Sequence, residues 1–151
     1  MRRMIVGLLL TLTVVCASAN AADNLRLNQK LDYTSDSQDG PLISGDHLED
    51  GAVPGMVNYV IMYGEGCFNS KRQARRTVNL WEKYKGRVNF VVIDLDHKQS
   101  KAQEELVSRY YRGYIPHIVI LDKSANAAYN QSGEVQESEI SSIIDKALAS
   151  R

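Results

Sequence analysis

Two long apolar runs on either side of one amphipathic segment limit what this chain can fold into. Residues 56–63 and 88–94 are rich in β-branched and aromatic side chains and show almost no alternation with polar residues, which is typical of strands buried on both faces of a sheet. Between them, apolar residues recur at helical spacing over about residues 70–85, and Gly86 follows as a helix stop. Two buried strands joined by a helix predict a parallel pair with a right-handed crossover.

The second half of the chain adds another helix and then an antiparallel hairpin. A helix pattern covers about residues 102–110. An apolar run at residues 117–121, entered by a proline, is followed by a polar turn and a shorter run at residues 127–131. An amphipathic helix with Ser138 as its expected N-cap closes the chain. This order, β-α-β-α-β-β-α, predicts an α/β fold with a central mixed β-sheet and helices on both of its faces.

Residues 1–22 have the features of a secretory signal peptide. Two arginines near the start supply positive charge, residues 5–15 are apolar, and small-residue cleavage patterns end at Ala19 and at Ala21. The apolar stretch is too short to span a bilayer. We therefore predict cleavage, an extracytoplasmic protein that is periplasmic or secreted, and no stable membrane span after cleavage.

This segment has two alternative interpretations: an uncleaved N-terminal anchor, or a lipoprotein signal in which Cys16 is the acylated residue. A lipoprotein signal has a small residue before its cysteine, and Val15 is β-branched, so we expect simple cleavage instead of lipid anchoring. Cleavage leaves Cys67 as the single cysteine of the mature chain. An unpaired thiol in an oxidising compartment tends to be oxidised, to pair between molecules, or to be used.

Residues 23–55 form a polar, turn-rich N-terminal extension with an excess of acidic residues. Apolar periodicity is weak there, so we expect a solvated linker before an ordered domain at residues 56–151. The alternative is that its acids lie against the basic helix that follows Cys67. Over the whole chain, 18 basic residues balance 18 acidic ones, which gives no indication of nucleic-acid binding.

Cys67 is the residue on which the functional prediction depends. It lies in the turn after the first buried strand and at the start of a helix, where unpaired N–H groups and the helix dipole favour a thiolate. Lys71, Arg72, Arg75 and Arg76 follow within the next turns, with no acidic residue among them. We expect their field to stabilise the thiolate; the alternative is a solvated basic face.

The ordered region resembles a known family in several of its segments. These segments follow one another in a characteristic order: Tyr63-Gly64-Glu65-Gly66-Cys67, Trp81-Glu82-Lys83-Tyr84, Val91-Val92-Ile93-Asp94-Leu95-Asp96, Arg112-Gly113-Tyr114-Ile115-Pro116, and Gly133 before the last helix. In this order they resemble the thioredoxin-like superfamily. The stretches at residues 86–92 and 114–122 are most similar to extracytoplasmic, membrane-associated thioredoxin-like proteins of cyanobacteria and thylakoids. The resemblance implies a thioredoxin fold over the ordered region.

The resemblance also implies roles for individual residues. Cys67 corresponds to the exposed nucleophile, and Pro116 to a cis-proline that faces it across a substrate groove. By the same resemblance, Ile115, Tyr63 and Phe68 are expected to contact the substrate, with the Ile115 backbone presented to an extended peptide.

Three departures from the family pattern bear on the chemistry. Ser70 replaces the second cysteine, so the motif is C-x-x-S; the buried acid of the family falls on Ile61, and its helix proline falls on Arg75. Cys67 retains the ability to attack a disulfide, but a hydroxyl cannot displace sulfur to release the product. Ser70 is expected to cap the helix and to hydrogen-bond the Cys67 thiolate.

Two functions of different classes follow. The first is a monothiol thiol–disulfide exchange protein, isomerase-like or deglutathionylating, whose partners are protein thiols, disulfides or glutathione and which needs an external thiol or a redox partner protein for release. The second is a redox-inert binding or assembly module that uses the groove between Cys67 and Pro116. His117 is expected at the strand end, with proton shuttling as an alternative role. His47 and His97 are isolated in the sequence, so we expect no metal and no cofactor.

Overall fold

The structure is a computed structural model and describes residues 21–37 and 40–150. The predicted signal peptide at residues 1–22, with Cys16, falls almost entirely outside the described residues and stays a prediction. Within the described ranges, no helix has the length and apolar character needed to cross a membrane.

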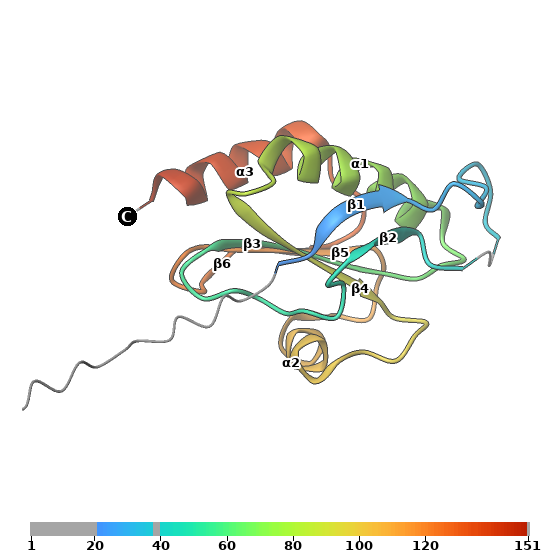
Figure 1. Cartoon of the computed structure of the whole chain (residues 1–151), viewed down its shortest axis with the longest axis horizontal. Coiled ribbons are helices and arrows are strands. Elements are labelled where there is room, and N and C mark those ends of the chain that lie inside the picture. Colours follow the sequence, from blue (N-terminus) through green and yellow to red (C-terminus); the bar gives the residue numbers. More distant parts are fainter. Residues whose placement is uncertain (1–20, 38–39, 151) are drawn as a thin grey trace, which may run out of the picture.

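The described residues form strands and helices in the order β1-β2-β3-α1-β4-α2-β5-β6-α3 (Figure 1). Their bounds are β1 Asp23–Leu27, β2 Ile43–Asp46, β3 Val57–Tyr63, α1 Phe68–Tyr84, β4 Val88–Asp94, α2 Lys101–Tyr110, β5 His117–Leu121, β6 Ala127–Ser132 and α3 Glu137–Ala149. From β3 onward this is the predicted β-α-β-α-β-β-α order.

The central sheet has four strands in the order β4-β3-β5-β6. β3 and β4 are parallel, with Val57 opposite Val88 and Tyr63 opposite Asp94, whereas β3–β5 and β5–β6 are antiparallel. Every residue of β3 is buried, because this strand has neighbours on both edges and helices on both faces. The predictions of a mixed sheet and of a parallel β-α-β unit are therefore confirmed.

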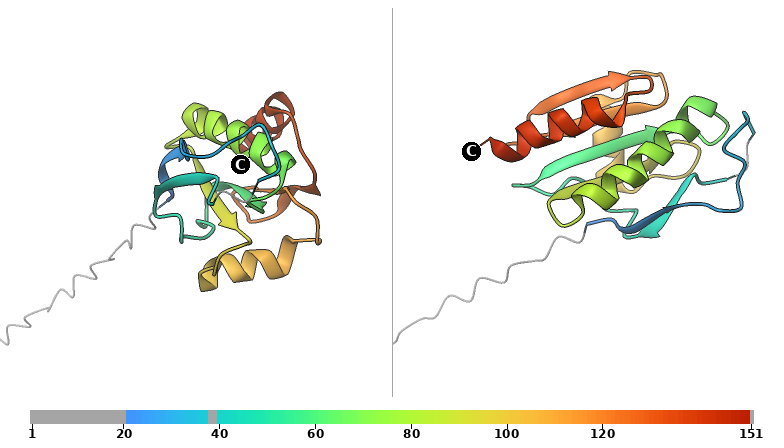
Figure 2. Two further views of the ribbon diagram at one scale, coloured as in Figure 1. Left: turned by 90° about the vertical axis from the view of Figure 1, so that its right-hand side faces the viewer. Right: turned by 90° about the horizontal axis from the view of Figure 1, so that it is seen from above.

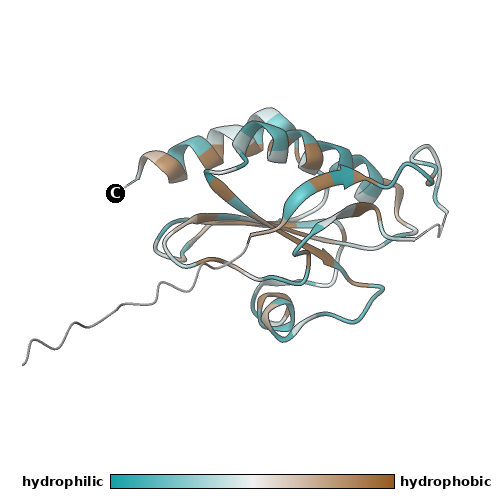
Figure 3. Cartoon of the chain, in the orientation of Figure 1, coloured by the Kyte–Doolittle hydropathy of each residue, from teal (hydrophilic) through white to brown (hydrophobic). Residues whose placement is uncertain are grey.

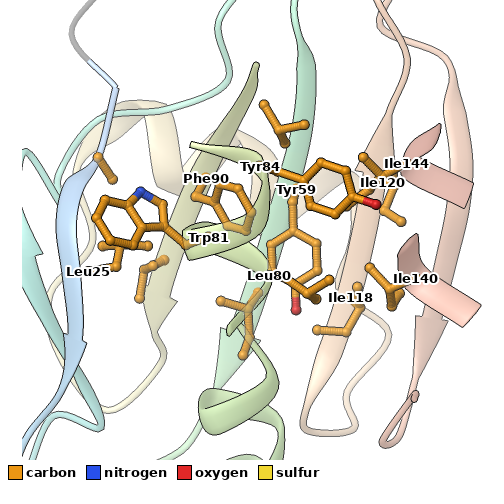
Figure 4. Close-up of a cluster of buried hydrophobic side chains, with 14 of the residues drawn as sticks. Leu25, Tyr59, Leu80, Trp81, Tyr84, Phe90, Ile118, Ile120, Ile140 and Ile144 are labelled. Carbon is orange, nitrogen blue, oxygen red and sulfur yellow. The ribbon is translucent and has the colours of Figure 1, made fainter. Parts of the chain in front are cut away.

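Helices cover the two faces of the sheet unequally. Figures 1 and 2 show α1 and α3 side by side on one face and α2 on the other. The larger apolar cluster lies between the sheet and the helix pair, with Tyr59, Phe90 and Ile118 facing Leu80 and Ile140 (Figure 4). A smaller cluster lies under α2. In Figure 3 the apolar colouring follows the central strands, and polar colouring dominates the loops.

Two predicted helix starts differ from the observed ones. α1 begins at Phe68 with Cys67 as its N-cap, so the prediction that Ser70 caps this helix is wrong. α3 begins at Glu137 with Gln136 as its N-cap, and the prediction of Ser138 is also wrong. Both serines lie inside the first turn of their helix, where sequence pattern locates a start only to within a few residues.

The extension at residues 23–55 is part of the fold, so the prediction of a solvated linker is wrong. β1 and β2 pair as an antiparallel two-stranded sheet. Leu25, Leu42 and Ile43 are each at most 2% exposed and belong to the larger apolar cluster. Figure 4 shows Leu25 beside Trp81 of α1. The alternative reading, in which the extension lies against the basic helix, is the one that the structure supports.

Candidate functional site

The candidate site is centred on Cys67, where β3 gives way to α1. The Cys67 N–H donates to the Gly64 carbonyl over 3.4 Å, and the Cys67 carbonyl accepts from the Lys71 N–H over 3.0 Å, which starts the helix. Cys67 is partly exposed. As the N-cap it stands at the positive end of the 17-residue helix α1, where a negative side chain is favoured. Its thiol makes no side-chain capping hydrogen bond.

The loop before Cys67 packs closely against the loop before β5. A Cβ atom added to Gly64 would lie 2.6 Å from Ile115 Cδ1, so a larger residue at position 64 would require the Ile115 side chain to move. The Ile115–Pro116 peptide bond is cis, as expected from the resemblance. Tyr114, just before it, is 75% exposed. Two segments about fifty residues apart in the sequence therefore meet at Gly64, three residues before Cys67.

Ser70 lies one helical turn after Cys67 but is fully buried. Its Oγ accepts from the Gly64 N–H over 3.5 Å, and within the described ranges no hydrogen bond joins it to the Cys67 thiol. The hydroxyl thus supports the backbone of the loop. It stands where a second thiol would have to stand to release a mixed disulfide.

Lys71, predicted to stabilise the thiolate, is buried instead of exposed. None of its surface is accessible. Its Nζ donates to the Asp32 carbonyl over 2.6 Å, to the Ser35 carbonyl over 2.9 Å and to Ser37 Oγ over 2.9 Å. This ammonium holds the loop between β1 and β2 against the first turn of α1, so much of its hydrogen-bonding capacity is directed at that loop.

The arginines of α1 also have partners of their own. Arg72 and Arg76 both form ion pairs with Glu134, in the loop between β6 and α3, and the Arg76 pair measures 3.0 Å. The Arg72 guanidinium lies over the Phe68 ring, 5.0 Å from its centroid. Exposed Arg75 lies over the Tyr33 ring at 5.6 Å. The arginine side chains of α1 therefore contact three neighbouring parts of the protein: the loop before α3, the first residue of α1, and the loop between β1 and β2.

The remaining predicted site residues divide between surface and core. Phe68 is partly exposed beside Cys67. Tyr63 is 1% exposed, and its hydroxyl accepts from the Leu42 N–H over 3.1 Å; burial raises the pKa of Tyr63. Ile61 is fully buried in the larger apolar cluster, with no acid at that position to accept a proton.

His117 is a core residue and not the surface residue that we expected. It is 1% exposed. One ring nitrogen lies 2.7 Å from Ser132 Oγ and the other 2.7 Å from Asn130 Oδ1, and burial lowers the pKa of His117. Both nitrogens are committed to β6, so the imidazole is placed to tie β5 to β6 and not to carry protons at the thiol.

His97 is not isolated, although the sequence suggested so. Its Nε2 lies 2.7 Å from Glu65 Oε1 and 4.0 Å from Asp94 Oδ2. The Glu65 N–H also donates to Asp96 Oδ2 over 2.7 Å, so the loop before Cys67 is fastened to the residues that follow β4. The hydrogen bond that His97 donates to the Glu65 carboxylate is the main cause that raises the pKa of His97. Burial, aided by the nearby Glu65 carboxylate, raises the pKa of Asp94 to about 6.

Solved structures share this architecture. A structure of chloroplastic thioredoxin z is 24% identical, with a TM-score of 0.52 over 64% of this chain and 81% of its own. A thioredoxin-like protein from Clostridium perfringens is 19% identical, with a TM-score of 0.53 over 64% of this chain and 74% of its own. The chain has a thioredoxin-like fold.

A curated relative of this thioredoxin-like chain is the chloroplastic thioredoxin-like protein HCF164 of Oryza sativa subsp. japonica. It is 29% identical over 122 residues, which cover 81% of this chain. The matched chain spans only 45% of the rice protein. No model of a protein family matches the sequence.

The sequence offered acids of the extension as possible neighbours of the basic helix, but it did not identify which acids bind the helix. Asp36 Oδ1 accepts from the Phe68 N–H over 2.5 Å, and Glu134 binds the two arginines described above. Asp36 precedes α1 by 32 residues and Glu134 follows its start by more than sixty. Their acidic type was the only signal in the sequence, and it does not select them from the other acids.

Proposed function

We propose that this protein is an extracytoplasmic thioredoxin-like protein that takes part in thiol–disulfide exchange through Cys67 alone. The observation that carries the proposal is the position of Cys67. It is partly exposed, it is the N-cap of α1, and it follows the Gly64 loop, which packs against the Ile115 side chain. An accessible thiol at a helix N-terminus has the setting of reactive cysteines.

The proposed exchange has two steps. The Cys67 thiolate attacks one sulfur of a client disulfide, a Cys67–client disulfide forms, and the other client sulfur leaves as a thiolate that takes a proton from water. An external thiolate, from glutathione or a redox partner protein, then attacks the mixed disulfide. Attack on the client sulfur joins the external thiol to the client and frees Cys67 as the thiolate. Attack on the Cys67 sulfur instead frees the client thiolate and leaves the external thiol bonded to Cys67, and a second external thiolate must then release it.

The environment of the thiol supports a monothiol sequence of this kind. Ser70 is fully buried and accepts from a backbone N–H, so it offers neither sulfur nor access to the mixed disulfide. Ile61 supplies no proton acceptor in the core. Both features favour trapping and external release over rapid turnover by the protein itself.

The experiment is to incubate the chain that begins at residue 22 with glutathione disulfide and with an oxidised model peptide, and to follow adducts by intact mass. We expect one adduct per chain, which dithiothreitol reverses and the Cys67→Ser variant lacks. A chain whose Cys67 is alkylated by iodoacetamide but forms no adduct with either disulfide would contradict the proposal.

The second candidate is a groove-binding module without redox chemistry. Tyr114 favours it, because this large side chain is 75% exposed beside the Ile115–Pro116 segment and exposed aromatic residues commonly anchor partners. Client binding that survives Cys67→Ser and is weakened by Tyr114→Ala would support this function. Binding that is lost with the thiol supports exchange.

The extracytoplasmic location rests on the predicted signal peptide. Expression of the full chain in a bacterial host is expected to give a periplasmic product whose N-terminus begins after Ala19 or Ala21. N-terminal sequencing decides between cleavage at these sites and retention of the segment.

A further inference from the structure

The loop between β1 and β2 touches the candidate site at the first amide of α1. Asp36 Oδ1 accepts from the Phe68 N–H over 2.5 Å. Phe68 is the first residue of α1 and follows Cys67 directly, so a carboxylate from a distant segment binds the helix end that carries the thiol. Figures 1 and 2 both show the β1–β2 loop at this end of α1.

Contacts along residues 32–37, which we call the docked segment, fix the position of Asp36. Buried Lys71 donates to three oxygens of this segment. Tyr33 lies under the Arg75 guanidinium, and its hydroxyl donates to the Leu42 carbonyl over 2.5 Å, at the start of β2. The docked segment is therefore tied both to α1 and to the two-stranded sheet.

The position of Asp36 places a negative charge near the Cys67 sulfur. Phe68 N is bonded to the Cys67 carbonyl carbon, so standard bond lengths put Asp36 Oδ1 within about 8 Å of Sγ, whichever rotamer the thiol adopts. A carboxylate at this distance opposes the formation of a second negative charge. It also offsets part of the positive charge at the N-terminus of the helix, which favours the thiolate.

Other charges near the thiol already have partners. In the loop before Cys67, Glu65 binds His97, and the Asp96 carboxylate accepts from the Glu65 N–H over 2.7 Å. On α1, Arg72 binds Glu134, and Lys71 is directed at the docked segment. On the loop before β5, Arg112 turns back to carbonyl groups of its own segment. Asp36 is the acid that the structure brings onto the first turn of α1 within the described residues.

We propose that Asp36 restrains Cys67: the docked segment sets the reactivity of the thiol by holding this carboxylate on the first amide of α1. Asp36 is a positioning residue and acts through charge and through the helix end. Wild-type Cys67 is then less reactive than a cysteine at the same helix N-terminus without the Asp36 carboxylate. Release of the docked segment raises the reactivity of the thiol. The biological meaning rests on the proposed exchange function, whereas alkylation reports on the thiol itself.

The test compares the pH dependence of iodoacetamide alkylation at Cys67 in the wild type and in Asp36→Asn. Asparagine keeps an acceptor for the Phe68 N–H and removes only the charge. At low salt we expect Asp36→Asn to be alkylated faster than the wild type over the rising part of the pH–rate profile, because a repelling charge has been removed. The rate at neutral pH rises about twofold to fourfold, because a more stable thiolate is also a weaker nucleophile. Salt reduces the difference.

Glu105→Gln is the matched control. It makes the same change in net charge on exposed α2, which covers the opposite face of the sheet, and its profile is expected to match that of the wild type. Equal profiles for Asp36→Asn and Glu105→Gln overturn the restraint, whatever the protein does with disulfides. A shifted Asp36→Asn profile without any mixed disulfide keeps the restraint and overturns the exchange function.

Hydrogen exchange at the Phe68 amide checks the contact independently of the thiol. The wild type and Asp36→Asn are expected to protect this amide, and Asp36→Ala to expose it, because alanine removes the acceptor. Equal exchange in all three chains shows that Asp36 does not bind the amide and overturns the inference.

Discussion

Ser70 shows how a single side chain limits the chemistry of this site. It is buried one turn after Cys67, and its hydroxyl supports the backbone of the Gly64 loop. Residues at the N-cap and at the third helical position lie on the same side of the first turn. A sulfur at position 70 would therefore stand close to the Cys67 sulfur.

Ser70→Cys is expected to convert trapping into release. The new thiol can attack a Cys67 mixed disulfide, so the adduct with an oxidised peptide becomes short-lived and an internal disulfide accumulates. Intact mass after acid quenching measures both species. Ser70→Ala is the control, and its adduct is expected to persist as in the wild type. An equally persistent adduct in Ser70→Cys would show that residue 70 does not face the thiol.

The buried Lys71 ammonium stabilises the fold by binding the loop between β1 and β2. Lys71→Met keeps most of the aliphatic stem but leaves the Asp32 and Ser35 carbonyls without the ammonium, so we expect a loss of about 1–3 kcal/mol in the free energy of unfolding. Urea denaturation measures the change. Lys101→Met, at an exposed lysine of α2, is the control and is expected to change stability by less than about 0.5 kcal/mol. Equal stabilities in the two variants would mean that the ammonium contributes nothing to docking.

At the scale of elements, β1 and β2 make the extension at residues 23–55 part of the folded domain. Leu25 is 2% exposed and packs with Trp81 in the larger cluster. We expect Leu25→Ala to reduce the free energy of unfolding by roughly 2–4 kcal/mol, in one cooperative transition by circular dichroism and by Trp81 fluorescence. Exposed Arg26→Ala is the control, with little effect. A stability loss confined to β1, with β3–β6 unchanged, would indicate a separate unit.

The elements from β3 onward could be predicted because their signals are local. The apolar runs of β3 and β4, the apolar face of α1 and the glycine after it each lie within a short window. The extension gave no such signal, since Leu25 and Leu42 are separated by polar turns and their partner Trp81 lies far along the chain. Apolar periodicity cannot report a contact that only tertiary packing creates.

The candidate site was predictable in its backbone and not in its electrostatics. Cys67 and Pro116 could be located because both lie in short segments that carry the family resemblance. The burial of Lys71 could not, since charged residues on a helix are usually solvated. The contacts of Asp36 with α1 and of His97 with Glu65 join residues about thirty apart, and the sequence does not pair them.

At the scale of the whole molecule, Asp94 links stability to pH. Its pKa is raised from an ordinary 3.8 to about 6, chiefly by burial, so the folded state binds this proton more tightly than the unfolded state does. The stability that this contributes is fully present below pH 3.8 and is lost as the pH rises through about 6. Above that range the fold retains a partly buried negative charge.

Asp94→Asn removes this dependence. The wild type is expected to lose stability relative to the variant between pH 4 and pH 6.5, by on the order of 1 kcal/mol because solvent still reaches the carboxyl. Urea midpoints at a series of pH values measure the difference in stability between the two proteins. The contributions of the titratable groups that both proteins share cancel in this difference. A constant difference across this range would show that Asp94 titrates normally in the folded protein. Asp145→Asn, which removes a carboxylate on α3, is the control.

The burial of Ser70 has a consequence for timing. If Cys67 forms mixed disulfides as proposed, each protein molecule holds one client until a second thiol arrives, and the lifetime of that adduct is inversely proportional to the concentration of the second thiol. The amount of protein then sets how many clients can be held, and the surrounding thiol pool sets for how long. The occupied fraction would therefore report the redox state of the compartment.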